Sequence, residues 1–199
     1  MARPAVISSA NLTDAAVRIV VERGLDAVSV RAVATEAGVS AGAVQHYFNS
    51  KDELLSAAYE RVMEQVGGRA RRLPDREVQP RAYVRALLME LLPLDREREG
   101  ELRVGIAFSA RSVHNPGLAA LYAEGYRALV GAVAAALTNA LERGEARPRV
   151  EPRREAARAV ALADGLAWHA LCAPGELRAT DTVPILDELL EAIFAPEPS

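Results

Sequence analysis

The side chains best suited to contacting a partner molecule lie on a short helix that we expect to begin just after Ser40. Its exposed face presents Ala41, Gly42, Gln45 and His46. A short helix of this kind, held by a second one, fits the major groove of DNA, where residues near its N-terminus meet the base edges. The sequence therefore predicts contact with DNA through this face.

The residues that usually perform catalysis or bind metals are few and scattered. The three histidines are His46, His114 and His169, on different predicted helices and without carboxylates at metal-ligand spacing. Cys172 is the single cysteine, so the chain has neither an internal disulfide nor a cysteine cluster for a metal. We expect no cofactor, no metal and no enzymatic activity, and a metal-dependent helical-bundle enzyme is the disfavoured alternative.

Two predicted helices hold the exposed face in place. The spacing of apolar residues predicts helices over residues 8–23, 30–37 and 41–47, with Ser29 and Ser40 as N-caps of the second and third. Gly38 suits the left-handed conformation of a tight turn between them. The helix-turn-helix motif thus spans residues 29–48.

The rest of the chain also has helical periodicity and no convincing alternating strand pattern. Ser50 and Glu53 form a capping box that starts a helix at Lys51, which we expect to reach about residue 66 or beyond. The charged segment 94–100 is either a loop or the start of the next helix. Further helices are predicted over residues 81–92, 101–113, 117–143, 153–172 and 182–194. The fold class is all-α.

Composition and charge set limits on the partners. The net charge is −3 over 199 residues, and residues 1–51 carry a net charge of only +1, so the DNA hypothesis rests on where the charges lie. The longest apolar stretch, residues 129–137, falls far short of the ~20 residues of a membrane span. No signal-peptide pattern follows Arg3, and we expect a cytoplasmic protein that does not enter a membrane.

Residues 29–55, SVRAVATEAGVSAGAVQHYFNSKDELL, resemble the DNA-binding signature of the TetR family of transcription regulators. Gln45 stands where the commoner family form has tyrosine. A polar, non-aromatic residue at this position is more typical of the branch that resembles BetI-type regulators. The segments LPLDREREGELRVGIAFSARSVHNPGL and ADGLAWHALCAPGEL are similar to the regulatory domain of that branch. The resemblance implies a DNA-binding domain over residues 1–51 and a ligand-binding and dimerisation domain over residues 52–199.

The resemblance also implies a role for each matching residue. Ser40, Tyr47, Lys51 and Arg31 are expected to contact DNA phosphates, and Lys51 lies at a helix N-terminus that itself favours anions. Gln45 is the candidate for reading a base, because its amide pairs with adenine through two hydrogen bonds. Small side chains at 41 and 42 permit close approach, and His46 contacts either base or backbone. The alternative for Tyr47 is that its ring only packs against the protein. The alternative for Lys51 and His46 is that their side chains are solvent-exposed and do not contact DNA.

The last two predicted helices are expected to form a homodimer. In the family they pair with their copies, which implies a palindromic double-stranded DNA operator with half-sites about 34 Å apart. The alternative is that their apolar faces only complete the core of one subunit. The residues expected to supply this surface are Val160, Leu166, Leu171, Val183, Leu186, Leu190 and Ile193.

A small-molecule effector is expected to bind among the C-terminal helices. Asp164 is a possible counter-charge if the effector is a cation. Taken singly, each candidate residue also suits the core or an interface. The function implied is a repressor that the effector releases from DNA; a ligand-independent DNA-binding regulator is the alternative. The candidate effector contacts are Phe108, His114, Tyr122, Tyr126, Trp168, His169 and Cys172.

Overall fold

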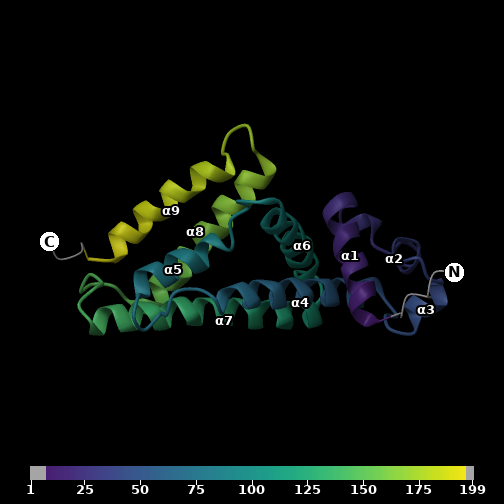
Figure 1. The fold of residues 1–199 in the computed structure, drawn as a ribbon, viewed down its shortest axis with the longest axis horizontal. Helices are drawn as coiled ribbons and strands as arrows, with labels where there is room; N and C mark the ends of the chain where they lie inside the picture. Colours follow the sequence, from purple (N-terminus) through teal and green to yellow (C-terminus); the bar gives the residue numbers. More distant parts are fainter. Residues whose placement is uncertain (1–7, 196–199) are drawn as a thin grey trace. The chain divides into compact units, whose positions relative to one another are not determined.

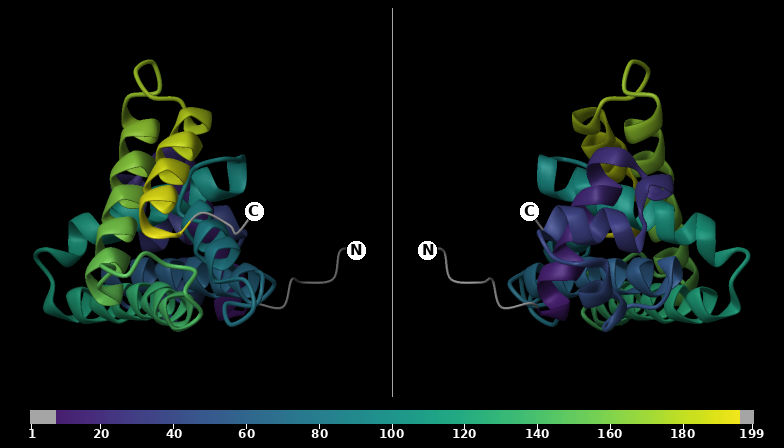
Figure 2. Two further views of the ribbon diagram at one scale, coloured as in Figure 1. Left: turned by 90° about the vertical axis from the view of Figure 1, so that its left-hand side faces the viewer. Right: turned by 90° about the vertical axis from the view of Figure 1, so that its right-hand side faces the viewer.

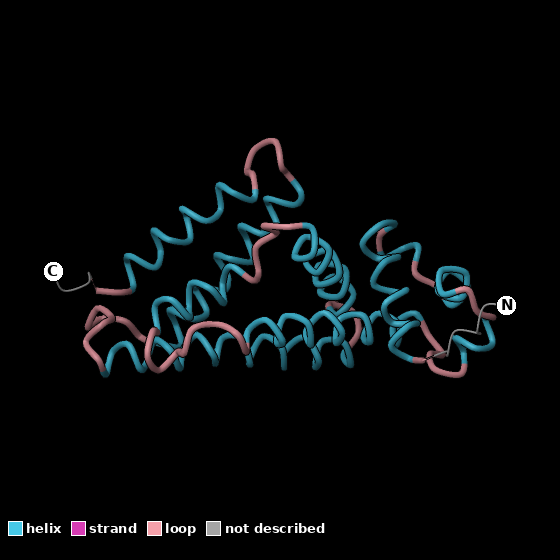
Figure 3. Tube along the Cα trace, viewed as in Figure 1, coloured by secondary structure: helices cyan, strands magenta, loops and turns pink. Residues whose placement is uncertain are grey.

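The computed structural model describes residues 8–195, and this part of the chain consists of helices joined by loops, with no β-strand (Figure 3). One isolated antiparallel bridge joins Ala146 to Phe194. The chain forms two compact units, residues 1–65 with 103–122 (unit 1) and residues 66–102 with 123–199 (unit 2). The all-α fold class is confirmed. The helices are α1 (Ser9–Arg23), the 3-10 turn η1 (Leu25–Ala27), α2 (Val30–Ala37), α3 (Ala41–Gln45), α4 (Lys51–Ala70), α5 (Pro80–Met89), α6 (Arg96–Ser112), α7 (Pro116–Glu142), α8 (Pro152–Cys172) and α9 (Ala179–Ile193).

Unit 1 contains the three N-terminal helices, which pack closely together (Figure 1). The apolar stripe of α1 is buried because its residues recur at helical spacing and face one core. A second cluster in unit 1 brings Tyr59 of α4 against Phe108 of α6, with ring centroids 3.9 Å apart and ring planes 8° from parallel. Leu55 and Leu118 complete that cluster. The first part of α4 is therefore anchored by apolar burial.

Unit 2 is built around α5, α8 and α9 and the later part of α7. The helices α8 and α9 pack side by side, in green and yellow in Figure 2, and α5 packs against both. Arg85 of α5 donates two hydrogen bonds to the carboxylate of Asp187 in α9, at 2.6 and 2.9 Å. The core of this unit is formed by small and branched apolar side chains, among them Val133, Leu137, Ala159, Val160, Ala163, Leu186, Leu190 and Ile193.

Three helices run from one unit into the other. The boundary falls after Gln65 in α4, after Leu102 in α6 and after Tyr122 in α7. The segment 94–100, left open by the sequence, belongs largely to α6, which begins at Arg96. The Asp95 carboxylate accepts the backbone N–H of Arg98 at 2.8 Å and so caps the start of the helix.

The prediction that α8 and α9 turn their main apolar residues toward a second subunit was wrong for most of the residues named. Val160, Leu166, Leu186, Leu190 and Ile193 are buried within the subunit's own core. Leu171 and Val183 are only partly buried. A helical apolar stripe shows that a face is covered, and only the packing shows whether the same chain covers it. Exposed apolar surface lies elsewhere on these helices, at Trp168 and Ile185.

Candidate nucleic-acid interface

The turn between α2 and α3 has the predicted geometry. Gly38 adopts φ 68° and ψ 34°, the left-handed region in which a side chain would be strained. The N–H of Val39 donates to the carbonyl of Ala34 at 2.9 Å, which closes the end of α2. The chain therefore leaves α2 sharply and enters α3 after three residues.

Side-chain caps start both helices of the motif. The hydroxyl oxygen of Ser29 accepts the N–H of Ala32 at 3.1 Å, and that of Ser40 accepts the N–H of Ala43 at 3.2 Å. Because Ser40 uses an oxygen lone pair for the cap, its hydroxyl proton remains available to a phosphate oxygen. Ser40 itself is exposed.

The outward side of α3 presents the predicted DNA-contacting residues. Gly42, Gln45 and His46 are exposed, and Ala41 is partly exposed. Helix α3 ends at Gln45, two residues earlier than expected, because the N–H of Tyr47 bonds to the carbonyl of Val44 in a tighter turn. The face of α3 is thus available to a partner.

Two aromatic side chains follow α3. The rings of His46 and Tyr47 meet edge to face with their centroids 5.2 Å apart. Both side chains are exposed, Tyr47 to 39%. Arg31 is also exposed, in the first turn of α2. These placements leave the predicted phosphate contacts of Tyr47 and Arg31 sterically possible, and the contacts remain predictions.

Apolar packing fixes the inner side of the motif. Val33 of α2 and Val44 of α3 are fully buried, and Phe48 retains only 7% exposure. Glu36 of α2 accepts Arg18 and Arg23 of α1 at 2.9 and 3.2 Å, and so ties the motif to the first helix. Sequence reasoning missed this ion triad, because no spacing rule relates side chains on two different helices.

The start of α4 positions Lys51. The N–H of Glu53 donates to the Ser50 hydroxyl at 3.1 Å, as the predicted capping box requires. The carboxylate of Glu53 reaches back to the N–H of Asn49 at 2.8 Å instead of to that of Ser50. Lys51 is partly exposed in the first turn, where the helix dipole favours an anion.

Within unit 1, the next residue of α4 fixes this helix start. The carboxylate of Asp52 accepts Arg111 of α6 at 2.8 Å and the amide of Asn115 at 2.8 Å. The hydrogen bond from Arg111, followed by that from Asn115, lowers the pKa of Asp52. Sequence analysis did not identify this contact, since the partners lie about sixty residues apart.

The seven candidate effector contacts do not belong to one compact unit. Phe108, His114 and Tyr122 lie in unit 1, and the other four, Tyr126, Trp168, His169 and Cys172, lie in unit 2. Phe108 is fully buried against Tyr59 in the unit 1 core, whereas the other six are exposed. Effector binding by these residues remains a prediction. Phe108 packs within the core of its own unit.

Asp164 of α8 differs from the other acidic residues. Desolvation by surrounding atoms raises its pKa, although its side chain keeps solvent contact. Within residues 8–195 it has no ion-pair partner, and it lies one helical turn before Trp168, which is 46% exposed. The carboxylate of Asp164 and the indole of Trp168 therefore lie on one face of α8, and both residues are exposed.

The described part of the chain offers neither a metal-binding cluster nor a membrane-spanning helix. Residues 8–195 contain no group of three or more His, Cys, Asp or Glu side chains arranged to hold a metal ion. Over the same part of the chain, no helix combines the length and apolar character needed to cross a bilayer. The capped helix-turn-helix is therefore the best-defined candidate site.

Comparison with known proteins decides the family. Residues 12–58 match the family described as bacterial regulatory proteins, tetR family, and residues 80–195 match the BetI-type transcriptional repressor C-terminal family. This chain belongs to the TetR family. The N-terminal match covers the capped motif, and the C-terminal match places the chain in the BetI-type branch that Gln45 and the two C-terminal segments suggested.

Several relatives resemble this TetR-family regulator over most of their length. The transcriptional regulator PksA of Bacillus subtilis is 31% identical over 92% of this chain and 87% of its own. The BetI regulator of Burkholderia thailandensis is 29% identical over 96% and 95%. A crystal structure of a transcriptional regulator from Rhodococcus sp. Rha1 has a TM-score of 0.84 at 31% identity, covering 96% of this chain and 100% of the other.

A further solved structure has the same fold and carries a ligand. It is a transcriptional regulator from Saccharomonospora viridis in complex with choline, with a TM-score of 0.80 at 20% identity over 94% of this chain and 97% of the other. The relatives are transcription regulators, and so is this TetR-family protein: a helix-turn-helix DNA-binding regulator and not an enzyme.

Proposed function

We propose that this regulator is a dimeric repressor that binds a palindromic double-stranded DNA operator and leaves it when a small molecule binds. The observation that carries the DNA part is the α3 face: a Ser40-capped helix whose exposed side holds Gln45 and His46 while Val44 is fully buried. Bacterial DNA lies in the cytoplasm, where we propose that the protein acts.

Each exposed group of the motif has a distinct role in the proposed complex. Gln45 reads one base edge through its amide, with Ala41 and Gly42 allowing the helix to approach closely. Ser40, Tyr47, Arg31 and Lys51 bind phosphates, and so position the helix without sequence preference. His46 contacts the base or the backbone beside Gln45.

Two substitutions separate base reading from phosphate binding. Gln45→Ala is expected to relax discrimination at one base position, with a cost of ~1–3 kcal/mol on the preferred operator. Lys51→Met is expected to weaken binding to all sequences alike. It should also reduce the slope of log K against log salt concentration by about one, because one fewer counterion is released on binding. Fluorescence anisotropy with the DNA upstream of the gene tests both. Equal binding of wild type and both variants to operator and random DNA contradicts the proposal.

The dimer is proposed to form through exposed parts of α8 and α9. Ile185 on α9 is 36% exposed, and Ala161 on α8 is exposed as well. Ile185→Asp is expected to shift the protein from dimer to monomer in sedimentation velocity, because it places a charge in an apolar contact. Glu191→Asp, also exposed on α9, is the matched control. A wild-type protein that is monomeric at micromolar concentration contradicts this part of the proposal.

The effector is proposed to be a small organic cation held by Asp164 and Trp168. An unpaired carboxylate attracts a cation, and an aromatic face binds quaternary ammonium groups. The choline complex of the Saccharomonospora viridis protein supports this class of ligand. We propose that the cation favours a conformer in which the two DNA-binding heads no longer match the operator.

Calorimetry with choline and a panel of tetraalkylammonium ions tests the effector. Asp164→Asn is expected to abolish binding, and Trp168→Leu to weaken it at least tenfold. Glu188→Gln, on the exposed side of α9, is the control for loss of a surface charge. If no cation binds while the operator does, the ligand-independent regulator becomes the better description; a thermal-shift screen across neutral and anionic metabolites then separates the two.

A further inference from the structure

Arginines gather at one end of unit 2, where α7 is joined to α8. Residues 143–158 contain six arginines and three acidic residues, although the whole chain has a net charge of −3. Figure 1 shows this connection beside the end of α9. A local excess of positive charge on an acidic chain is a surface suited to an anionic partner.

Backbone hydrogen bonds hold the connection against the end of α9. Ala146 and Phe194 form the isolated antiparallel bridge, and the N–H of Arg147 donates to the carbonyl of Ile193 at 3.0 Å. The N–H of Val150 then donates to the carbonyl of Arg147 at 3.0 Å. The segment is therefore ordered before any partner binds, which lowers the entropic cost of binding.

The acidic residues of this segment are already occupied. Glu151 accepts the backbone N–H of Arg154 at 2.8 Å and so caps the start of α8. The other two carboxylates accept neighbouring arginine side chains, Glu145 that of Arg143 at 2.6 Å and Glu155 that of Arg158 at 3.1 Å. Half of the arginines in the segment are left without a carboxylate partner in the described part of the chain.

The unpaired arginines with unused side chains are Arg149, Arg153 and Arg154. All three are exposed, and their guanidinium groups form no hydrogen bond or ion pair with any residue between 8 and 195. Arg153 and Arg154 lie in the first turn of α8, where the helix dipole disfavours a cation. The stability of α8 therefore does not explain arginine at these positions, whereas a bound anion would.

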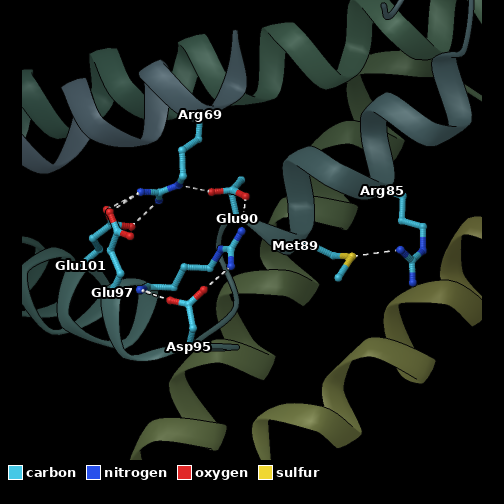
Figure 4. A network of polar contacts seen from close by, with 8 residues as sticks. Arg69, Arg85, Met89, Glu90, Asp95, Glu97 and Glu101 are labelled. Carbon is cyan, nitrogen blue, oxygen red and sulfur yellow. Dashed lines mark hydrogen bonds and ion pairs between the residues drawn. The ribbon is translucent and has the colours of Figure 1, made fainter. Parts of the chain in front are cut away.

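Two arginines elsewhere in unit 2 are used within the subunit. Figure 4 shows Arg69 between the carboxylates of Glu90 and Glu101, with which it forms ion pairs. Arg85 donates to Asp187 at 2.6 Å. Such a guanidinium spends its N–H donors inside the protein, while an unpaired one keeps all five for a partner.

The loop before α5 adds a fourth arginine to the same end of unit 2. The amide of Asn139, near the end of α7, donates to the carbonyls of Arg76 and Glu77 at 3.0 and 2.8 Å. The guanidinium of Arg143 also donates to the carbonyl of Glu77, at 3.2 Å. The side chain of Arg76 is exposed and has no partner among the described residues. We name as the arginine patch the residues Arg76, Arg149, Arg153 and Arg154.

The chemistry of the patch favours a chain of phosphates. A guanidinium binds a phosphate through two parallel N–H bonds, and a patch carried by two segments suits an extended polyanion. Protein interfaces are enriched in aromatic residues, and so are helices that lie on membranes. Residues 71–79 and 143–158 contain no aromatic residue. Binding to a DNA backbone needs only placed cations.

We propose that the arginine patch binds the backbone phosphates of double-stranded DNA without sequence preference. It is a DNA contact separate from the helix-turn-helix, and three of its four arginines lie in the region that matches the BetI-type C-terminal family. The inference goes beyond the proposed function, because it needs neither a defined operator nor an effector. The phosphates belong either to DNA that flanks the operator or to a second duplex.

The salt dependence of binding to a random-sequence duplex tests the patch in the full-length protein. Arg149→Gln/Arg153→Gln/Arg154→Gln is expected to reduce the slope of log K against log salt concentration by about 2.7, because three phosphate contacts are lost. Affinity should fall at least about tenfold near 50 mM salt. The corresponding triple lysine variant keeps the charges and should keep most of the slope.

A control removes the same charge from exposed arginines elsewhere in unit 2, in the variant Arg96→Gln/Arg127→Gln/Arg178→Gln. This control is expected to leave the slope close to that of the wild type. An unchanged slope in the patch variant overturns the proposal. An equal fall in the patch variant and the control also overturns it, because net charge would then explain the effect.

Two further arms identify the partner. Protein saturated with a short operator duplex is mixed with a labelled random duplex, and its capture through the patch indicates a second duplex. A patch-dependent gain in affinity only for operators with long flanks indicates the same DNA. Patch-dependent flotation with phosphatidylglycerol vesicles, at an unchanged DNA slope, assigns a lipid surface and overturns the proposal. If no sequence is preferred over random DNA but the patch variant still loses slope, operator reading fails and the patch stands.

Discussion

Helices α4 and α6 contact each other in both compact units, through apolar packing in one unit and through ion pairs in the other. In unit 1 they are joined by the stacked rings of Tyr59 and Phe108, both nearly inaccessible to solvent. In unit 2 the contact is ionic, between Arg69 and the carboxylates of Glu97 and Glu101. One helix pair is thus held by burial at one end and by charge at the other.

The difference has consequences for how each contact responds to its surroundings. Apolar burial is non-directional and insensitive to salt and pH, so the stacked rings hold whenever the unit is folded. Ion pairs depend on geometry and on protonation, and breaking a buried one leaves a charge without compensation. The unit 2 contact is therefore the one that a fall in pH can weaken, whereas the unit 1 contact persists as long as the unit is folded.

The largest effect is expected from removing the stacked ring. Phe108→Ala deletes a fully buried aromatic side chain, and should lower the free energy of unfolding by about 3–5 kcal/mol. Urea unfolding at fixed protein concentration measures it, with Phe108→Leu as the milder control. A loss below about 1 kcal/mol would show that the stack does not anchor α4.

Breaking the ionic contact comes next. Arg69→Met keeps the aliphatic stem but leaves Glu90 and Glu101 short of a partner, at an expected cost of about 2–3 kcal/mol after allowing for the 23% exposure of Arg69. Arg72→Met is the matched control, since Arg72 is exposed at the end of the same segment. Equal stability of the two variants would remove the contrast between the units.

Acid should weaken the unit 2 contact selectively. The hydrogen bonds and charges of Arg98 and Arg69 lower the pKa of Glu90 below its ordinary 4.5, so its contribution is complete above that value and is lost as the pH falls through the lower, folded pKa. Hydrogen exchange below pH 4.5, corrected for intrinsic rates, should quicken first around residues 66–70. In Glu90→Gln this dependence of the exchange rates on pH should become smaller. If acid quickened exchange around Phe108 at the same pH, the unit 1 and unit 2 contacts would not be independent.

The smallest effect is expected from the exposed ion pair of unit 1. Asp52→Asn removes the pairing with Arg111 but keeps a hydrogen-bonding side chain of the same size. Half of the Arg111 side chain is exposed, so water and salt already screen the pair. The melting temperature should fall by less than in Arg69→Met, and the difference from wild type should vanish at 1 M salt. A larger loss than that of Arg69→Met would reverse the comparison.

Local features of the fold were predictable because their causes lie close together in the chain. Ser29, Ser40 and Gly38 act on neighbours within a few residues, and each adopts the predicted cap or turn. The earlier start of α9, at Ala179, was not predicted, because Pro184 inside the helix makes a later start look natural. Likewise, the long helix α4 continues through two glycines that usually mark an end.

For the DNA-contacting face, the sequence by itself determined which residues are available: the caps, the turn and the burial of Val44 leave the side holding Gln45 outward. Only the tertiary structure decided that Phe108 packs against Tyr59, that the apolar residues of α8 and α9 fill their own core, and that Arg69 finds Glu101. The physical reason is range. Caps and turns are set by bonds spanning three or four residues, whereas a side chain's distant partner depends on how whole helices pack.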